Sequence, residues 1–346
     1  MPASQPPPLK GFESLIPGTH AAPSGSVISF SHTPPARHRR GSPILLLLHG
    51  WPESRFMWRY AVPALAARGY TLFVPDLPGY GSSTVPARVS ASAASKHDRV
   101  TVGSSLLSAV RAAYPDDDDD DKQESSGPLR IVLVGHDRGA RVSQRLATSP
   151  SPAAAATTIL GAMLLDIVPY SAQWAAHGAN PRAATAYFHW AFLPCADLST
   201  PMIRAFGGGA FCKAIMERGV GDDAAGRARV YADGAVEDHY APLYERDAVI
   251  EGAAADYGAG AAEDWDEEMR DRELGRRIGV PTYVVYSERN LGRMHGDVKK
   301  IWREWVREDV AFEVHGVGNG IGHYLPEEAP DEINAHIFRF LESLGV

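Results

Sequence analysis

The sequence predicts an α/β fold, a mostly parallel sheet with helices on both faces and a helical segment inserted between two of its strands. Short apolar runs alternate with longer amphipathic stretches, which is typical of parallel strands joined by crossover helices. Residues 44–48 (ILLLL) are wholly aliphatic, as expected of a strand buried on both faces. From about residue 168 to residue 265 the strand-like runs stop, and stretches rich in Ala, Gly and aromatic residues predict an inserted helical cap.

The remaining elements follow from the same alternation. Residues 1–40 begin Pro-rich and predict a loosely ordered segment with one early strand, and the core is expected over 41–167 and 266–346, around the cap over 168–265. Residues 115–128 form an expected acidic surface loop, because the adjacent carboxylates of residues 116–121 repel one another. The expected strands are 44–48, 71–74, 130–134, 162–165, 282–286 and 311–314, and the expected helices are 58–68, 102–114, 138–148, 297–307 and 330–344.

Composition and charge exclude several classes of protein. The 346 residues carry a net charge of -8 with Lys and Arg scattered along the chain, so no basic stripe for nucleic acid is present. Two cysteines, Cys195 and Cys212, cannot form a disulfide framework. The longest weakly polar stretch, residues 153–165, is too short to span a bilayer. We expect a soluble, cytoplasmic protein with a small-molecule substrate and no cofactor, metal, nucleic acid or membrane partner. A homodimer stays open.

The strongest motif lies between an expected strand and an expected helix. Residues 135–139 (GHDRG) fit the nucleophile-elbow pattern Gly-x-Ser-x-Gly, with Asp137 in place of serine. The outer glycines allow a sharp turn that exposes the central side chain. The helix N-terminus favours an anion there, so Asp137 is expected to be ionised. The alternative is an ordinary acidic residue that caps a helix.

Three further groups follow the carboxyl ends of expected strands, where ligands bind in open α/β sheets. Residues 49–52 (HGWP) occupy the place of a loop that donates a backbone N–H to an oxyanion. Asp166 ends the strand after the elbow, and His323 lies between the last strand and the last helix. We therefore predict Asp137 as nucleophile, His323 as base and Asp166 as acid. His323 without a role, and Asp297 as a rival acid, remain alternatives.

The residue types indicate the chemistry. A carboxylate is a weak nucleophile toward carbonyl carbon but displaces a leaving group at saturated carbon, which gives an alkyl-enzyme ester. His323 would then activate water to attack this ester, with Asp166 orienting the imidazole. The backbone N–H groups of Trp51 and Arg138 are the expected oxyanion donors. This machinery favours alkyl halides or epoxides over ordinary esters.

Four segments together resemble the fluoroacetate dehalogenases, α/β-hydrolases related to the epoxide hydrolases. They are residues 136–141 (HDRGAR), 165–169 (LDIVP), 188–190 (FHW) and 322–328 (GHYLPEE). The resemblance implies that Arg138 and Arg141 clamp a substrate carboxylate, and two guanidinium groups on one helical turn can face one pocket. It also implies that His189, Trp190 and Tyr257 stabilise the departing halide. A surface position for Arg141, and simple packing of the His-Trp pair, are the alternatives.

Two competing functions stay open. An epoxide hydrolase would use the same Asp137 and His323 and open the ring with acidic phenols from the cap. A ligand-binding protein on the same scaffold would keep these residues without turnover. The Arg138/Arg141 pair favours a haloacetate or 2-haloacid dehalogenase. Trp51, where the family often has Phe, and the Gly-rich cap segment near residues 207–209 depart from the family and leave the substrate less defined than the chemistry.

Overall fold

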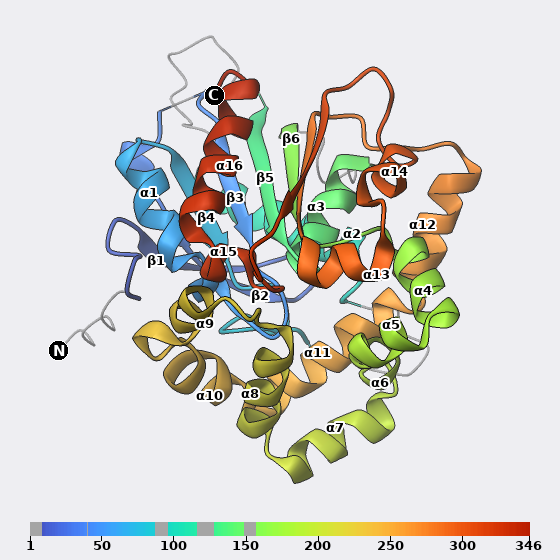
Figure 1. The fold of residues 1–346 in the computed structure, drawn as a ribbon. Helices are drawn as coiled ribbons and strands as arrows, with labels where there is room; N and C mark the ends of the chain where they lie inside the picture. The colour runs from blue at the N-terminus through green and yellow to red at the C-terminus, as the bar shows by residue number, and fades with distance from the viewer. Residues whose placement is uncertain (1–8, 40, 87–95, 116–127, 149–156) are drawn as a thin grey trace, which may run out of the picture.

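One mixed sheet organises the structure. The computed structural model describes residues 9–39, 41–86, 96–115, 128–148 and 157–346, so the acidic run 116–121 lies outside the described residues. Within these ranges eight strands form one sheet in the order β1-β2-β4-β3-β5-β6-β7-β8 (Figure 1). The strands are β1 Ile16–Ala21, β2 Val27–His32, β3 Ile44–Leu48, β4 Thr71–Pro75, β5 Leu129–His136, β6 Thr157–Leu165, β7 Thr282–Ser287 and β8 Phe312–Val317. From β4 to β8 all neighbouring strands are parallel, which confirms the predicted α/β fold.

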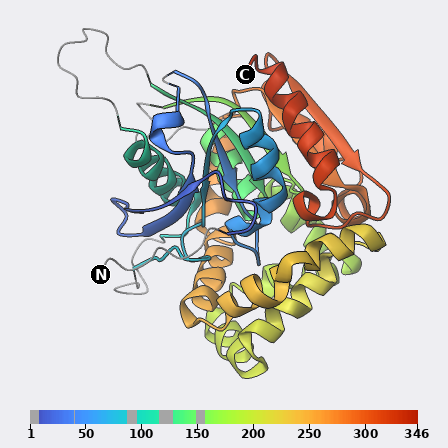
Figure 2. The ribbon, with the colours of Figure 1, turned by 90° about the vertical axis from the view of Figure 1, so that its left-hand side faces the viewer.

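Helices on both faces bury the central strands. All residues of β3 are fully buried, as its uninterrupted aliphatic sequence predicted. Helices α1 and α16 contact each other on one face of the sheet, while α2 and α3 contact each other on the opposite face (Figure 2). The helices outside the insertion are α1 Ala61–Ala67, α2 Arg99–Ala113, α3 Arg138–Thr148, α13 Arg293–His295, α14 Val298–Arg303, α15 Leu325–Glu328 and α16 Pro330–Ser343.

The helical insertion leaves the core after β6 and returns before β7. Most of its helices lie below the sheet in Figure 1, while α12 lies to the right of the sheet. They are α4 Tyr170–Ala179, α5 Pro181–Ala186, α6 His189–Phe192, α7 Ala196–Phe206, α8 Gly208–Gly219, α9 Ala224–Tyr231, α10 Ala241–Tyr244, α11 Asp247–Gly260 and α12 Glu263–Glu273. None of the helices in the described part of the chain is long and apolar enough to cross a membrane.

Three elements differ from the expectation. The N-terminal segment has two strands instead of one, and β1 and β2 pair as an antiparallel ribbon on the edge of the sheet at β4. Residues 55–60 form a 3₁₀ helix before α1, where one helix was expected. The insertion extends to Glu273 rather than residue 265. Helix α12 lacks an apolar stripe because its inward-facing residues, Asp264, Glu268 and Asp271, are buried acids that bind arginines and backbone N–H groups.

The first turn of α3 depends on a glycine, and this gives a stability prediction. A Cβ on Gly139 would lie 2.5 Å from the carbonyl oxygen of Leu48 and 2.6 Å from that of His49, both backbone atoms that cannot move away easily. We expect Gly139→Ala to lower the free energy of unfolding by about 1–3 kcal/mol, or to prevent folding. Gly178→Ala in α4 meets nothing within 4 Å and should stabilise by about 0.5–1 kcal/mol. Thermal midpoints of the two variants measure the contrast, and equal midpoints would contradict it.

Candidate active site

The turn between β5 and α3 holds Asp137 in a conformation rare for a non-glycine residue. Its φ is 45°, and the residue is only 7% exposed. The turn can be this tight because the flanking glycines touch backbone: a Cβ on Gly135 would lie 2.6 Å from the amide nitrogen of Ala140. The Trp51 backbone N–H donates to Asp137 Oδ1 at 3.0 Å. The strained turn therefore presents one carboxylate oxygen to a backbone donor and leaves the other free to react.

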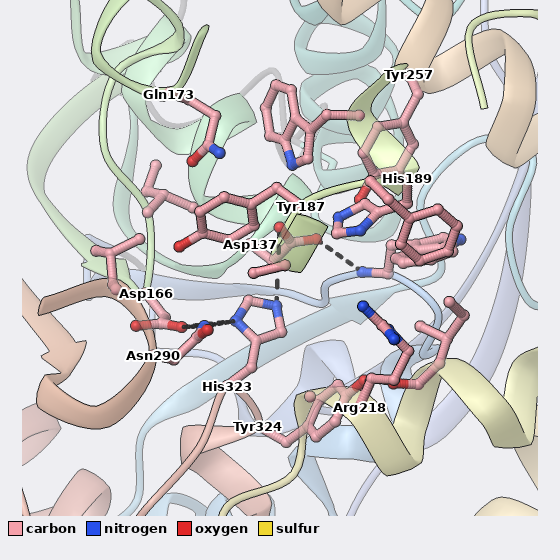
Figure 3. Close-up of a pocket in the computed structure, with 18 of the residues that line it drawn as sticks. Asp137, Asp166, Gln173, Tyr187, His189, Arg218, Tyr257, Asn290, His323 and Tyr324 are labelled. Carbon is pink, nitrogen blue, oxygen red and sulfur yellow. Dashed lines mark hydrogen bonds and ion pairs between the residues drawn. The ribbon is translucent and has the colours of Figure 1, made fainter. Parts of the chain in front are cut away.

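His323 lies between two carboxylates (Figure 3). Its Nδ1 is 2.6 Å from Asp166 Oδ2, and its Nε2 is 3.9 Å from Asp137 Oδ2. Burial alone would lower the pKa of His323, but the hydrogen bond and charge of Asp166, together with the charge of Asp137, outweigh it and raise the pKa above the ordinary value. Burial raises the pKa of Asp137, yet the charges of His323 and Arg138 prevail and lower it. The interaction between His323 and Asp137 therefore favours the ionised form of the Asp137 carboxylate.

Asp166 is fixed by the segment that follows β7. The Ser287 backbone N–H donates to Asp166 Oδ1 at 2.8 Å, and the Asn290 amide donates to Oδ2 at 2.9 Å. Asp166 itself has a φ of 52°. Asp297, the rival acid, instead accepts the Lys300 backbone N–H at the start of α14. The structure thus brings Asp166 rather than Asp297 to His323.

A second buried histidine, His136, contacts the loop that carries His323. His136 is the residue before Asp137, and its Nε2–H donates to the His323 carbonyl oxygen at 2.8 Å. Burial lowers the pKa of His136 to about 4, so the ring is neutral. Its Nδ1 lies 3.2 Å from Glu53. His136 therefore links the elbow to the loop that carries His323, without adding charge beside Asp137.

A cavity of about 330 Å³ opens in front of Asp137, between the sheet and the helical insertion. Asp166 and His323 line it together with five of the residues predicted for substrate contact or oxyanion binding: Trp51, Arg141, His189, Trp190 and Tyr257. Arg138 is not among the lining residues. Residues that the sequence analysis did not single out also line it, including Gln173, Tyr187, Arg218 and Asn290.

Arg138 is bound to an acid from the insertion. Its Nε donates to Asp256 Oδ2 at 2.6 Å and its Nη2 to the Asp256 carbonyl oxygen at 2.9 Å. Asp256 also pairs with Arg99 and accepts the Tyr80 hydroxyl at 2.6 Å. Arg138 and Arg141 were both expected to clamp a substrate carboxylate, but Asp256 holds Arg138 behind the cavity wall, and of these two arginines only Arg141 lines the cavity.

Aromatic rings form one side of the cavity. The His189 ring stacks on Trp51 with centroids 4.9 Å apart, and the Tyr257 ring meets both edge-on at 5.4–5.5 Å. Burial lowers the pKa of His189 to about 3, so its imidazole is neutral and has a single N–H to donate. The Tyr257 hydroxyl is buried without a hydrogen-bond partner. This side of the cavity thus combines an apolar surface with donors that suit a polarisable anion.

Sequence reasoning missed the polar residues outside the motifs. Asn290 follows the carboxyl end of β7, so the rule that located Asp166 could also have found it. Gln173 belongs to α4, and Tyr187 lies in the turn between α5 and α6, where no motif distinguishes either residue. Among the described residues, no group of three or more His, Cys, Asp or Glu side chains is arranged to hold a metal ion.

Comparison with known proteins identifies the family of this fold. The model of the alpha/beta hydrolase family matches residues 45–336. A fluoroacetate dehalogenase from Burkholderia sp is 27% identical over 302 residues, which is 86% of this chain and 87% of that protein. Epoxide hydrolase A from Mycobacterium tuberculosis is 34% identical over 102 residues, 30% of this chain and 26% of that protein.

Solved structures extend the similarity to the whole fold. A candidate epoxide hydrolase from Pseudomonas aeruginosa superposes with a TM-score of 0.75 at 26% identity, covering 98% of each chain. A candidate α/β hydrolase from Nostoc sp PCC 7120 gives a TM-score of 0.76 at 28% identity, over 95% of this chain and 99% of the other. With the sheet order, the elbow and the match over residues 45–336, the chain belongs to the alpha/beta hydrolase family and is related to fluoroacetate dehalogenase and the epoxide hydrolases.

Proposed function

We propose that the protein is a haloacid dehalogenase that works through a covalent ester on Asp137. The observation that carries this proposal is a buried cation, Arg141, in the same cavity as a carboxylate at a nucleophile elbow. The carboxylate provides a nucleophile for saturated carbon, and the cation provides a binding partner for an anionic substrate.

The first step forms the ester. Asp137 Oδ2 attacks the carbon that bears the halogen, a C–O bond forms as the carbon–halogen bond breaks, and the halide leaves with the electron pair. Oδ1 is the oxygen already bound by the Trp51 N–H, which supports Oδ2 as the attacking atom. Donors from His189, Trp190 and Tyr257 solvate the departing halide. The backbone N–H of Arg138 remains a predicted second oxyanion donor.

The second step hydrolyses the ester. Neutral His323 takes a proton from water through Nε2, and the resulting hydroxide attacks the carbonyl carbon of the Asp137 ester. The negative charge develops on Oδ1, where the Trp51 N–H lies. Collapse breaks the bond between the carbonyl carbon and Oδ2, the proton of the added hydroxyl passes to the leaving oxygen, and the hydroxy acid departs as the carboxylate is restored. Asp166 stabilises the imidazolium until its proton passes to solvent.

The cavity is large for the smallest haloacid. A haloacetate has only a handful of non-hydrogen atoms, whereas 330 Å³ would hold about ten waters at about 30 Å³ each. This supports 2-haloacids with a side chain, in addition to haloacetates, as the substrate class.

One observation favours epoxide hydrolysis as a second candidate. The hydroxyls of Tyr187 and Tyr257 are both buried without a partner, and both residues line the cavity. Burial raises the pKa of each phenol, so both stay protonated and able to donate to an epoxide oxygen. An epoxide, however, would leave the Arg141 guanidinium without an anion, and this favours the haloacid. The complete Asp137, His323 and Asp166 set favours turnover over a binding role alone.

Trapping the ester tests the proposed function. His323→Ala removes the base that hydrolysis needs but not the nucleophile, so chloroacetate should leave a carboxymethyl group on Asp137 in nearly all molecules. Intact-protein and peptide mass spectrometry measures the adduct, and the double variant with Asp137→Asn should show none. A neutral epoxide of similar size should react more slowly. Faster trapping of the epoxide would move the function to epoxide hydrolysis, and loss of activity without any adduct would contradict the assigned role of His323.

The raised pKa of His323 predicts the pH dependence. Hydrolysis needs the neutral imidazole, so kcat should fall as the pH drops through the pKa of His323, which the hydrogen bond and charge of Asp166 raise. Asp166→Asn removes the hydrogen bond and charge that raise this pKa, so the midpoint should move to lower pH and the maximal rate should fall. Asp297→Asn is the matched control and should leave the midpoint unchanged. Equal shifts in the two variants would refute Asp166 as the partner of His323.

A further inference from the structure

Arg141 is a buried cation without a counter-ion. Its side chain is 2% exposed, and no carboxylate of the described residues lies within 4 Å of its guanidinium. Arg99 and Arg138, close by, each pair with Asp256. A guanidinium left uncompensated in a buried site is unfavourable unless an anion completes it. The charges of Asp137 and Glu268 act on Arg141 from a distance, and a negatively charged ligand in the cavity would compensate it directly.

Two aromatic rings fix the direction in which Arg141 can bind that ligand. The guanidinium carbon lies 4.3 Å from the Tyr170 ring centroid and 4.6 Å from that of Trp190. Such contacts cover the faces of the guanidinium but leave its N–H groups free. Nε and Nη1 are buried and have no hydrogen-bond partner. The donors in the guanidinium plane are thus available to an acceptor in the cavity.

Two neutral donors accompany Arg141 in the cavity wall. Gln173 and Tyr187 are each more than nine-tenths buried. The Gln173 Nε2 and the Tyr187 hydroxyl have no hydrogen-bond partner in the protein. In Figure 3 they lie to one side of Asp137, while His189 and Tyr257 lie to the other. The charge of Arg141 also acts on Tyr187, and burial raises the pKa of that phenol so that it keeps its proton. Buried donors without protein acceptors are uncommon in folded proteins, and these two line the cavity, where an acceptor can reach them.

We propose that Arg141, Gln173 and Tyr187 together bind the substrate carboxylate, as one cation and two neutral donors. This assignment rests on the proposed haloacid function and replaces the pair of arginines that the family resemblance implied. Arg138 is not part of the site, since it does not line the cavity and Asp256 holds its Nε and Nη2. With the substrate carboxylate bound by these three residues, the halogen points toward His189 and Tyr257. The reacting carbon then lies between the carboxylate and the halogen, in front of Asp137.

A binding experiment in a variant that cannot turn over tests this site. Asp137→Asn keeps the size of the side chain and removes the nucleophile, and chloroacetate binding to it is followed by the fluorescence of Trp51 and Trp190, which line the cavity. Adding Gln173→Leu should weaken chloroacetate binding by about tenfold or more, because a hydrogen bond to a charged group is lost. Tyr187→Phe should act in the same direction. Binding of the neutral chloroacetamide should change much less in both variants.

A matched control separates the carboxamide from general damage. Gln144→Leu, also in the Asp137→Asn background, removes a buried amide that donates to Glu268 and does not line the cavity, so chloroacetate binding should stay unchanged. If chloroacetate binds the parent and both Gln173→Leu and Tyr187→Phe bind it equally well, the three-residue site is refuted while the haloacid function stands. If the parent binds no chloroacetate but does bind a neutral epoxide, the haloacid function and the site are both refuted.

Discussion

The close approach of the elbow to the neighbouring strand is the constraint on which the site depends. Gly139 touches the backbone at the end of β3, and its N–H donates to the His49 carbonyl oxygen at 2.9 Å. The same contact brings the Trp51 N–H to Asp137 and aligns the carboxyl ends of β3, β5 and β6. Asp137 is held at a positive φ by this packing, so its carboxylate, the proposed nucleophile, has a fixed orientation.

Charge compensation explains why neighbouring arginines behave differently. Asp256 takes the charges of Arg99 and Arg138, and these two arginines lower its pKa despite the opposing effect of burial. The resulting network ties α2, α3 and α11 together behind the cavity wall. Arg141, one helical turn beyond Asp137, receives no such partner, so its charge remains available to a ligand. A substrate carboxylate would complete the one buried cation of this cluster that the described residues leave uncompensated.

Much of this arrangement could be predicted from sequence, because strand ends and motif spacing are local properties. The positions of Asp137, Asp166 and His323 at one edge of the sheet follow from the order of strands alone. The ion pair of Arg138 could not be predicted. Spacing on α3 indicates that Arg138 and Arg141 share a helix face, but Asp256, which binds Arg138, lies 118 residues away in the insertion. Gln173 and Tyr187 escaped notice for the same reason, since the insertion folds by long-range packing without a repeating pattern.

The central claim is that an oxygen atom of Asp137 becomes part of the product. A single turnover of excess enzyme with chloroacetate in heavy-oxygen water tests it most directly, with the glycolate and the peptide that carries Asp137 analysed by mass spectrometry. The account predicts that the first glycolate contains no solvent oxygen at its hydroxyl and that Asp137 acquires the heavy isotope. Solvent label in the first hydroxyl, with an unlabelled Asp137, would mean direct attack by water and would contradict the covalent mechanism.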